Sequence, residues 1–369
     1  MLKPARLNSI DMLRGFVIAL MALDHVRDYF GQAPFNAEDL AATTPAWFWT
    51  RWITHLCATC FVLLAGSSAF LRGQVQGTPA LSRYLATRGA LLVLLEMTWV
   101  SFSWQFGFNV AILQVIWAIG MGMLLLSLLV WLPQPAIAAI AAALILPHNL
   151  LDGFKPDGIL WQAWHQGGFT PLPGGHGIFI KYPLMPWLGW IAAGYALGPV
   201  FRWEAARRQR FLLAASALMM LAFVALRAGN LYGDPTPWSP QGHGAMFDLM
   251  SFMRVEKYPP SLLYLLVTGS IGLALLVLFE RVRTIGWMAL FGRTPMFFYM
   301  VHVALVHLLG VIYMQLRFGG QVEYSNGAVH LPNGYTPSLT VVYSAWVSIL
   351  VLMYGLTILW CRYRTKQKT

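Results

Sequence analysis

The sequence predicts an all-α protein: a polytopic transmembrane helical bundle of about ten spans with both termini in the cytoplasm. Hydrophobic residues make up 58% of the 369-residue chain and charged residues only 11%, less than half of the share of about 25% that is usual in soluble domains. Apolar segments near the length of about 20 residues that a bilayer core requires recur along the chain. Because no polar stretch long enough for a soluble domain separates them, we expect residues 1–369 to form a single transmembrane domain.

Ten apolar segments are candidate spans. The first is interrupted by Asp24 and has no clean apolar core with a small-residue cleavage site, so we interpret it as an uncleaved span rather than a signal peptide. The fifth is short and rich in alanine, and as a partial span it leaves a total of nine to eleven. In chain order the segments are 12–30, 53–71, 88–104, 109–131, 135–150, 182–200, 211–226, 261–279, 295–316 and 339–360.

The basic residues set the orientation. With the N-terminus in the cytoplasm, 17 Lys and Arg residues lie inside and eight lie outside, as the positive-inside rule requires. The connections 31–51, 151–181 and 227–260 then fall on the outer side. The net charge of +11 is therefore a topology signal, and because the basic runs lack the interleaved aromatic residues of a nucleic-acid groove, we expect membrane lipids and no nucleic acid as partners. The 17 basic residues predicted on the cytoplasmic side include three near the termini: Lys3, Arg6 and Lys368.

The first segment carries the most charge. Ionisable groups inside a span cost about 2.5–3.5 kcal/mol on insertion scales and are functional candidates by default. Arg14 and His25 are eleven residues apart, so on one helix they share a face about 16 Å apart along the axis. This spacing predicts Arg14 near the cytoplasmic surface and His25 near the middle of the membrane. The alternative is an interfacial ion-pair cluster in which Asp24 and Asp28 neutralise Arg27.

The second segment adds Arg51 and His55, which are four residues apart and face the same way. His55, Cys57 and Cys60 would suggest a metal site, but no second ligand pair with zinc spacing occurs in the chain, so we expect no metal.

Three further polar residues lie within apolar segments. Glu96 and Gln114 are candidate site residues, with interhelical hydrogen bonding as the commoner role for each. His302 shares a helix face with Tyr299, whereas His307 lies about 140° away and is expected to be a packing residue.

The outer connections combine aromatic and polar residues, a pattern that can form a platform for a sugar ring. The same pattern is equally typical of the interfacial aromatic belt, and Lys257 could simply snorkel. The candidates for substrate binding in these connections are His148, Asn149, Asp152, Trp238 and Lys257.

The residues alone leave two classes of function open. One is a membrane-embedded group-transfer enzyme with a histidine-centred site. The other is a proton-coupled transporter or flippase of a sugar or lipid-linked solute. The absence of an internal sequence repeat disfavours the transporter.

Several motifs in combination resemble the heparan-α-glucosaminide N-acetyltransferase catalytic-domain family, most closely its bacterial branch within the transmembrane acyltransferase superfamily. The motifs lie across nearly the whole chain. They are the segments 6–15, 20–25, 54–57, 64–68, 94–96, 114–120, 148–152, 182–187, 257–262 and 292–295, the last leading to Tyr299 and His302.

This resemblance implies ten or eleven spans, cytosolic acetyl-CoA as acyl donor, and a sugar or glycan acceptor on the outer side of a bacterial inner membrane. A homodimer is suggested by the resemblance alone. His25 stands where the animal members have an asparagine, and no histidine matches their catalytic one, near whose place Asn36 lies; His25 is therefore favoured over His55.

Together these observations predict acetyl transfer from acetyl-CoA to an amine or hydroxyl. His25 would be the base, because a histidine accepts and releases protons near neutral pH. Asp24 or Asp28 would orient it, and Arg51, His55 or His302 would position the thioester carbonyl and the acceptor. The predicted CoA-binding residues are Arg14, Arg88, Arg293 and Gln114, with positive-inside anchoring as the alternative for the arginines. The predicted substrate-binding residues are Glu96, His148, Asn149, Asp152, Trp238 and Lys257.

Overall fold

The computed structural model describes residues 7–319, 323–325, 328–331 and 335–367. The basic residues Lys3, Arg6 and Lys368 lie outside this part of the chain. Seven of its helices are long and apolar enough to cross a membrane, which confirms the all-α polytopic class. The span count of ten and the cytoplasmic termini stay predictions.

The chain divides into two compact units. Unit 1 comprises residues 1–57, 102–107 and 278–369, and unit 2 comprises residues 58–101 and 108–277. The elements centred in unit 1 are α1 (Asn8–Val26), η1 (Arg27–Gly31), α2 (Pro45–Trp52), η2 (Ile53–His55), α5 (Ser101–Gln105), α13 (Gly286–Arg293), α14 (Pro295–Phe318), β4 (Glu323–Ser325), β5 (Ala328–His330) and α15 (Leu339–Lys366).

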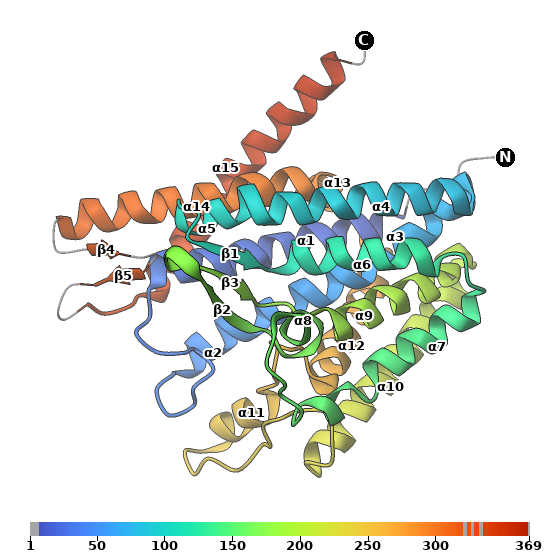
Figure 1. The fold of residues 1–369 in the computed structure, drawn as a ribbon, viewed down its shortest axis with the longest axis horizontal. Helices are drawn as coiled ribbons and strands as arrows, with labels where there is room; N and C mark the ends of the chain where they lie inside the picture. The colour runs from blue at the N-terminus through green and yellow to red at the C-terminus, as the bar shows by residue number, and fades with distance from the viewer. Residues whose placement is uncertain (1–6, 320–322, 326–327, 332–334, 368–369) are drawn as a thin grey trace. The chain divides into compact units, whose positions relative to one another are not determined.

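Helix α1 is the centre of unit 1. Most of its residues are buried, and it packs against α13, α14 and α15 (Figure 1). A Cβ atom at Gly15 would lie 1.8 Å from the carbonyl oxygen of Met288, and one at Gly292 would lie 1.8 Å from that of Asp11. The absence of side chains at these two positions therefore lets α1 and α13 meet backbone to backbone.

Unit 2 is a helical body with a small sheet. Helix α4 packs on α6, and α9 packs on both α6 and α7. The elements centred in unit 2 are α3 (Leu56–Gln76), α4 (Thr78–Leu95), η3 (Glu96–Val100), β1 (Val110–Leu113), α6 (Val115–Leu129), α7 (Gln134–Ile145), η4 (His148–Leu151), α8 (Ile159–Trp161), η5 (Gln162–Gln166), β2 (Gly168–Leu172), η6 (Pro173–Gly175), β3 (His176–Ile180), α9 (Leu184–Leu197), η7 (Gly198–Arg202), α10 (Ala205–Ala228), α11 (Ala245–Met253) and α12 (Leu262–Arg281).

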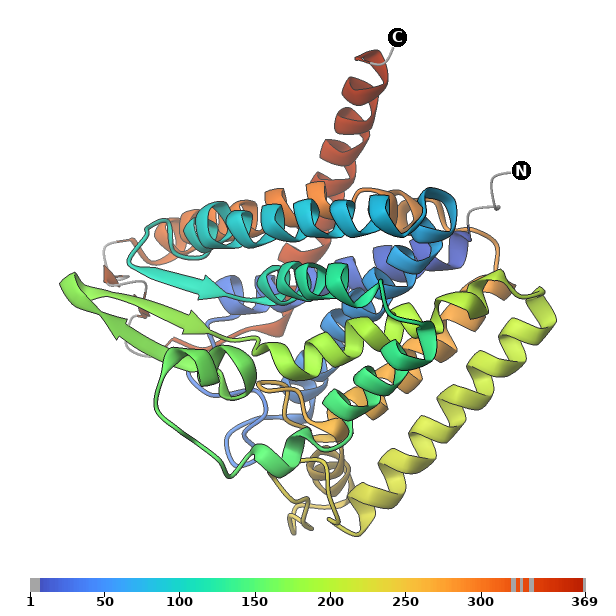
Figure 2. The same cartoon turned by 45° about the vertical axis from the view of Figure 1, so that its right-hand side comes forward.

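The first residues of segment 109–131, which we predicted to be helical, form a strand of this sheet. Strand β1 pairs in parallel with β3, with Val110 opposite Gly177, and β2 pairs antiparallel on the other side of β3 (Figure 2). Segment 109–131 therefore divides into a strand and a 15-residue helix. Its first residues leave the helical pattern because their backbone groups bond to a strand more than 60 residues away in the chain.

Segment 135–150 is also interrupted. Helix α7 ends at Ile145, and Pro147, which cannot donate a backbone hydrogen bond, precedes the short turn η4.

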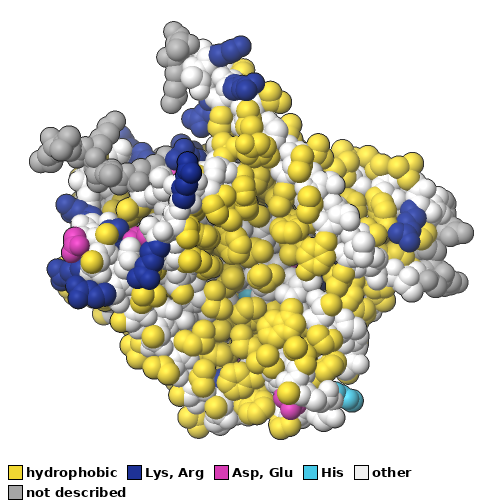
Figure 3. Space-filling view, turned by 180° about the vertical axis from the view of Figure 1, so that it is seen from behind, with side chains coloured by type: hydrophobic (Ala, Val, Ile, Leu, Met, Phe, Trp, Pro, Cys, Tyr) yellow, Lys and Arg dark blue, Asp and Glu magenta, His cyan; other side chains and the backbone are white. Residues whose placement is uncertain are grey.

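Large hydrophobic side chains are exposed on the candidate spans, for example Leu221 of α10 and Val351 of α15. Figure 3 shows hydrophobic side chains dominating one face of the molecule. Such a surface is suited to contact with lipid acyl chains rather than with water.

Candidate active site

The histidine site of unit 1 begins where α1 changes its winding. Helix α1 ends at Val26 and continues as the π-helical turn η1, a rare conformation that is frequent at functional sites. The last turn of α1 carries Asp24 and His25, and η1 carries Arg27 and Asp28. The charged residues of the first segment are thus presented at one helix end.

His25 and His302 are hydrogen-bonded to each other. The distance from Nδ1 of His25 to Nε2 of His302 is 2.9 Å, and the two rings are stacked with centroids 5.0 Å apart. The indole of Trp104 packs edge-on against the His25 ring at 4.7 Å. Both imidazoles are buried. The structure therefore brings together two predicted site residues that are 277 positions apart in the chain.

The surroundings of His302 fix the tautomers of the pair. Its Nδ1 lies 2.9 Å from the carbonyl oxygen of Phe298 and 3.0 Å from that of Tyr299. Because carbonyl oxygens only accept, Nδ1 of His302 carries the proton, and in the neutral ring Nε2 is the acceptor. His25 then donates from Nδ1, which leaves Nε2 as the proton-accepting nitrogen of neutral His25.

Asp24 is the centre of an ion-pair cluster beside this pair. Nη1 of Arg51 donates to both carboxylate oxygens of Asp24 at 2.9 Å, and Nη2 of Arg27 donates to Oδ1 at 3.1 Å. Arg27 also pairs with Asp28 at 2.7 Å. The neutralisation of Arg27 that the sequence suggested is therefore present, with Arg51 as a second partner of Asp24.

Glu38 connects Arg51 with His55. Its Oε1 lies 2.9 Å from Nε2 of His55, and its Oε2 lies 3.7 Å from Nε of Arg51. The side chains of Arg51 and His55 thus do face the same way. Sequence reasoning missed Glu38, because it and its neighbour Asp39 lie in the connection 31–51 and outside the apolar segments, where an acid carries no spacing signal.

An aromatic stack lies next to this cluster in unit 1. The ring of His307 is stacked on Phe106 at 3.9 Å and on Tyr29 at 4.5 Å. Its Nδ1 donates to the carbonyl oxygen of Ser103 at 2.9 Å. This environment agrees with the packing role expected for His307, and the tyrosine and phenylalanine at its two faces were not anticipated.

Two arginines predicted to bind CoA belong to unit 1. Arg293 has a half-exposed side chain, with Nε 3.5 Å from the carboxylate of buried Asp11, and it also donates to Asn8 at 3.5 Å. Arg14 is half-buried on α1. In unit 2, Arg88 is exposed and lies with its guanidinium 5.8 Å from the ring of Tyr84.

Glu96 and Gln114 meet at the start of α6. Gln114 is the residue before this helix, and Oε2 of the fully buried Glu96 accepts from the backbone N–H of Trp117 at 2.8 Å. A carboxylate at this position satisfies backbone donors that have no partner within the helix. The π-helical turn η3 begins at Glu96 itself.

The predicted substrate-binding residues after α7 form a frame within unit 2. Nδ1 and Nε2 of His148 lie 2.6 Å and 2.8 Å from the carbonyl oxygens of Ile145 and Pro260. Oδ1 of Asn149 accepts from the backbone N–H of Leu262 at 2.9 Å, and its amide donates to Asp152. The motif therefore ties the end of α7 to the start of α12.

Asp152 is a half-buried acid of this frame. Oδ1 lies 3.2 Å from Nε2 of His165. Burial alone would raise the pKa of Asp152, but the hydrogen bonds from His165 and Asn149 outweigh it and lower that pKa below its ordinary value.

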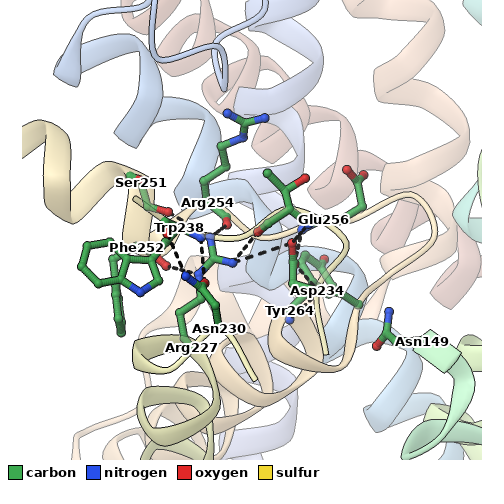
Figure 4. A network of polar contacts seen from close by, with 12 residues as sticks. Asn149, Arg227, Asn230, Asp234, Trp238, Ser251, Phe252, Arg254, Glu256 and Tyr264 are labelled. Atoms are coloured by element: carbon green, nitrogen blue, oxygen red, sulfur yellow. Dashed lines mark hydrogen bonds and ion pairs between the residues drawn. The ribbon is translucent and has the colours of Figure 1, made fainter. Parts of the chain in front are cut away.

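A second frame in unit 2 is built around Arg227, at the end of α10. Its buried guanidinium donates to the carbonyl oxygens of Thr236, Ser251, Phe252 and Arg254, as Figure 4 shows. The backbone N–H of Trp238 donates to Asn230, and its indole donates to Ala228. The indole N–H of Trp238 is thus occupied by the backbone.

A cavity of about 510 Å³ lies between these two frames of unit 2. It is polar on several sides. Its lining includes Asn149, Asp152, Arg227, Asn230, Tyr232 and Asp234.

Within the described residues, no group of three or more His, Cys, Asp or Glu side chains converges as metal ligands would. Cys57 instead donates its thiol to the carbonyl oxygen of Val17.

A buried histidine pair and a charged cluster inside a polytopic helical fold define a membrane protein with a candidate acid–base site. The family model described as heparan-alpha-glucosaminide N-acetyltransferase, catalytic, matches residues 6–230. Since this is more than half of the chain, the protein belongs to that family of membrane acetyltransferases. No curated protein matches the sequence. His25 lies within the matched region, whereas Trp238, Lys257, Arg293 and His302 lie beyond it.

Proposed function

We propose that the protein transfers the acetyl group of cytosolic acetyl-CoA to an amine or hydroxyl of a sugar or glycan on the outer side of a bacterial inner membrane. The hydrogen bond between His25 and His302 carries this proposal. It supports a general base at His25 inside a membrane acetyltransferase, where an acyl acceptor must lose a proton.

In the proposed reaction, Nε2 of His25 accepts a proton from the acceptor as its nitrogen or oxygen attacks the thioester carbonyl carbon. The resulting tetrahedral species collapses when the C–S bond breaks, and the proton passes from His25 to the departing sulfur. CoA-SH and the acetylated acceptor are the products. The proton that leaves the acceptor is thus the one that CoA receives.

His302 is a positioning residue in this scheme. It accepts from Nδ1 of His25 and is itself held by two backbone carbonyls, so it orients the base and keeps the reactive lone pair on Nε2. The charged cluster of Asp24, Arg27, Asp28 and Arg51 supplies fixed dipoles nearby, and Arg51 is the donor we favour for a developing oxyanion.

An acetyl-histidine intermediate is the variant of this mechanism. Nε2 of His25 would then attack the thioester carbon directly, and the acceptor would take the acetyl group in a second step. Both routes need the same tautomer of His25.

The donor would be held by arginines. Arg14 lies in the first half of α1, and Arg293 lies in α13, which packs against α1. We expect both on the cytoplasmic side. Guanidinium groups suit the geometry of phosphate. Glu96, Gln114 and the polar cavity residues of unit 2 remain candidates for binding the substrates.

Replacing His25 by alanine tests the proposal. CoA release from acetyl-CoA, measured on the purified protein with a panel of amino sugars and glycans, should fall by about 10²–10⁴-fold. The unfolding temperature in detergent should change little, and His243→Ala, which removes an exposed histidine, should leave turnover unchanged. Unaltered turnover in the His25 variant, or solute uptake into vesicles without acetyl-CoA, would refute acetyl transfer at this site.

A further inference from the structure

Trp104 packs against the ring of the proposed base. The ring centroids of Trp104 and His25 are 4.7 Å apart, with an angle of 76° between the ring planes, and both residues belong to unit 1. Nε1 of the Trp104 indole is shielded from solvent and has no hydrogen-bond partner among the described residues. A buried donor without a partner is costly, so an orphaned N–H group beside a base points to a ligand.

The position of Trp104 distinguishes it from two other tryptophans with the same property. Trp117 and Trp187 of unit 2 also have buried indole nitrogens without a partner in the described part of the chain. Trp187 packs against the rings of Tyr182 and Tyr264. An unpaired indole N–H is therefore not by itself a site, and the contact with His25 is the second observation that makes Trp104 a candidate.

The main chain around Trp104 is held in place without the use of its indole N–H. The hydroxyl of Tyr29 donates to the carbonyl oxygen of Trp104 at 2.7 Å, and Nδ1 of His307 donates to that of Ser103 at 2.9 Å. Phe106 stacks on His307 with the ring centroids 3.9 Å apart. The elements η1 and α14 thus fix the short helix α5, and a donor that is fixed in advance needs no reorganisation when charge develops on a substrate.

In the proposed reaction the thioester carbonyl must lie close to His25. The attacking atom of the acceptor is expected within about 3 Å of Nε2 of His25, and the carbonyl carbon about 3–3.5 Å from that atom. The carbonyl oxygen therefore lies in space bordered by the nearest neighbours of the His25 ring, and Trp104 is one of these neighbours.

Arg51, the oxyanion donor favoured above, is already engaged. Its Nη1 donates to both carboxylate oxygens of Asp24 and to the hydroxyl of Thr54, so an oxyanion would have to share these donors. The indole N–H of Trp104 has no such bond to another described residue. Because an indole nitrogen only donates, Trp104 does not compete with His25 for the proton of the acceptor.

We propose that the indole N–H of Trp104 is a catalytic donor to the carbonyl oxygen of the acetyl thioester, and that it forms the oxyanion site together with Arg51. This assignment rests on the proposed function. As the acceptor attacks, the π electrons of the carbonyl group move onto its oxygen, where the indole N–H stabilises the negative charge. They return to the carbon–oxygen bond as the C–S bond breaks, and Trp104 itself transfers no proton.

The indole N–H signal of Trp104 tests this contact without any acceptor. The sample is the full-length protein in neutral detergent with ¹⁵N-labelled tryptophan, and the signal is identified by its loss in Trp104→Phe. One probe is an analogue of acetyl-CoA in which a methylene group replaces the thioester sulfur, which keeps the carbonyl group but cannot transfer acetyl. The other is S-ethyl-CoA, which lacks the carbonyl oxygen. We expect the ketone analogue to shift the Trp104 signal downfield and S-ethyl-CoA to leave it nearly unchanged.

Kinetics of Trp104→Phe test the catalytic role. This change keeps an aromatic ring beside His25 and removes the N–H group, so kcat for CoA release with the best acceptor of the amino sugar and glycan panel should fall by about 10²-fold. The KM for acetyl-CoA and the apparent pKa in the pH profile of kcat/KM should stay the same. A residue that acted only by packing against His25 would shift that apparent pKa instead.

Trp346→Phe is the matched control in unit 1. The indole of Trp346 donates to the carbonyl oxygen of Ala19 at 2.8 Å, so the same change removes a hydrogen bond within the protein. We expect Trp346→Phe to lower the melting temperature and to retain the wild-type kcat. Trp104→Phe should show the opposite pattern, a large loss of kcat with a smaller change in melting temperature.

The role of Trp104 would be overturned by a ketone analogue that binds without moving the Trp104 signal, or by a folded Trp104→Phe variant with the wild-type kcat. The His25→Ala variant should lose turnover and still show the downfield shift, because the N–H contact does not depend on the base. Absence of binding by both CoA analogues would refute the proposed function itself, so the two failures are distinguishable.

Discussion

His25 and His302 of unit 1 contrast with His148 of unit 2, although all three are buried histidines near polar clusters. The pair in unit 1 shares a side-chain hydrogen bond, and its tautomers leave a basic nitrogen on His25. Both ring nitrogens of His148 lie against backbone carbonyls. The first arrangement can move a proton, whereas the second holds two chain segments together.

The arginines of the two units repeat this contrast. Arg51 binds the carboxylate of Asp24, a partner whose charge it balances next to the histidine pair. Arg227 donates to four backbone carbonyls instead and lies 3.8 Å from Asp234. The side-chain partners of Arg51 place it in a cluster suited to chemistry, whereas the backbone partners of Arg227 give it a role in fixing loops.

The largest effect on stability is expected for Arg227→Met. This change leaves four carbonyl groups without their buried donor and Asp234 without its ion-pair partner, so we expect the unfolding free energy to fall by about 3–5 kcal/mol. Arg254→Met is the matched control, because Arg254 contributes its backbone carbonyl to the same network while its guanidinium points away from it (Figure 4). Thermal unfolding in detergent measures the stability of both variants.

A control variant that loses as much stability as Arg227→Met would contradict the assignment of the frame to the Arg227 guanidinium. Conversely, a stable Arg227→Met protein would remove the basis for assigning the fixing of these loops to the guanidinium of Arg227.

Much of the helical fold could be predicted from apolar length. Segments 261–279 and 295–316 correspond closely to α12 (Leu262–Arg281) and α14 (Pro295–Phe318), because about 20 apolar residues bounded by charges or proline define a helix well. The sheet could not be predicted, since β1 pairs with β3 far along the chain and hydropathy contains no information about register.

Several members of the candidate site stood out in the sequence, but the contacts between them did not. The charge of the first segment identified Asp24, His25 and Asp28, because ionisable groups are costly inside an apolar helix. The partnership of His25 with His302 depends on how α1 packs against α14, and neither periodicity nor spacing specifies that contact. The same limit applies to Glu38, whose role arises only from the path of its loop.

His302→Ala should have the second-largest effect, this time on activity. Without its hydrogen-bond acceptor, His25 can rotate and change tautomer, so we expect kcat to fall by about 10²-fold, or roughly 2.7 kcal/mol of transition-state stabilisation, with little change in KM. His302→Gln should recover part of kcat, because its amide group can both accept from His25 and donate to a carbonyl. Steady-state kinetics of CoA release give the effects on kcat and on KM separately. A rise in KM at unchanged kcat would instead assign His302 to substrate binding.

The smallest effect concerns Asp152 in the frame of unit 2. Because the pKa of its folded carboxyl lies below the ordinary value, ionised Asp152 stabilises the fold above the unfolded pKa of about 3.9, and this contribution is lost as the pH falls through the folded pKa. Asp152→Asn should therefore melt about 1–3 °C lower than the wild type between pH 5 and 7, and the gap should narrow as the pH falls below about 4. A gap that stays constant down to pH 3 would show that the variant acts through altered packing of the frame rather than through the charge of Asp152.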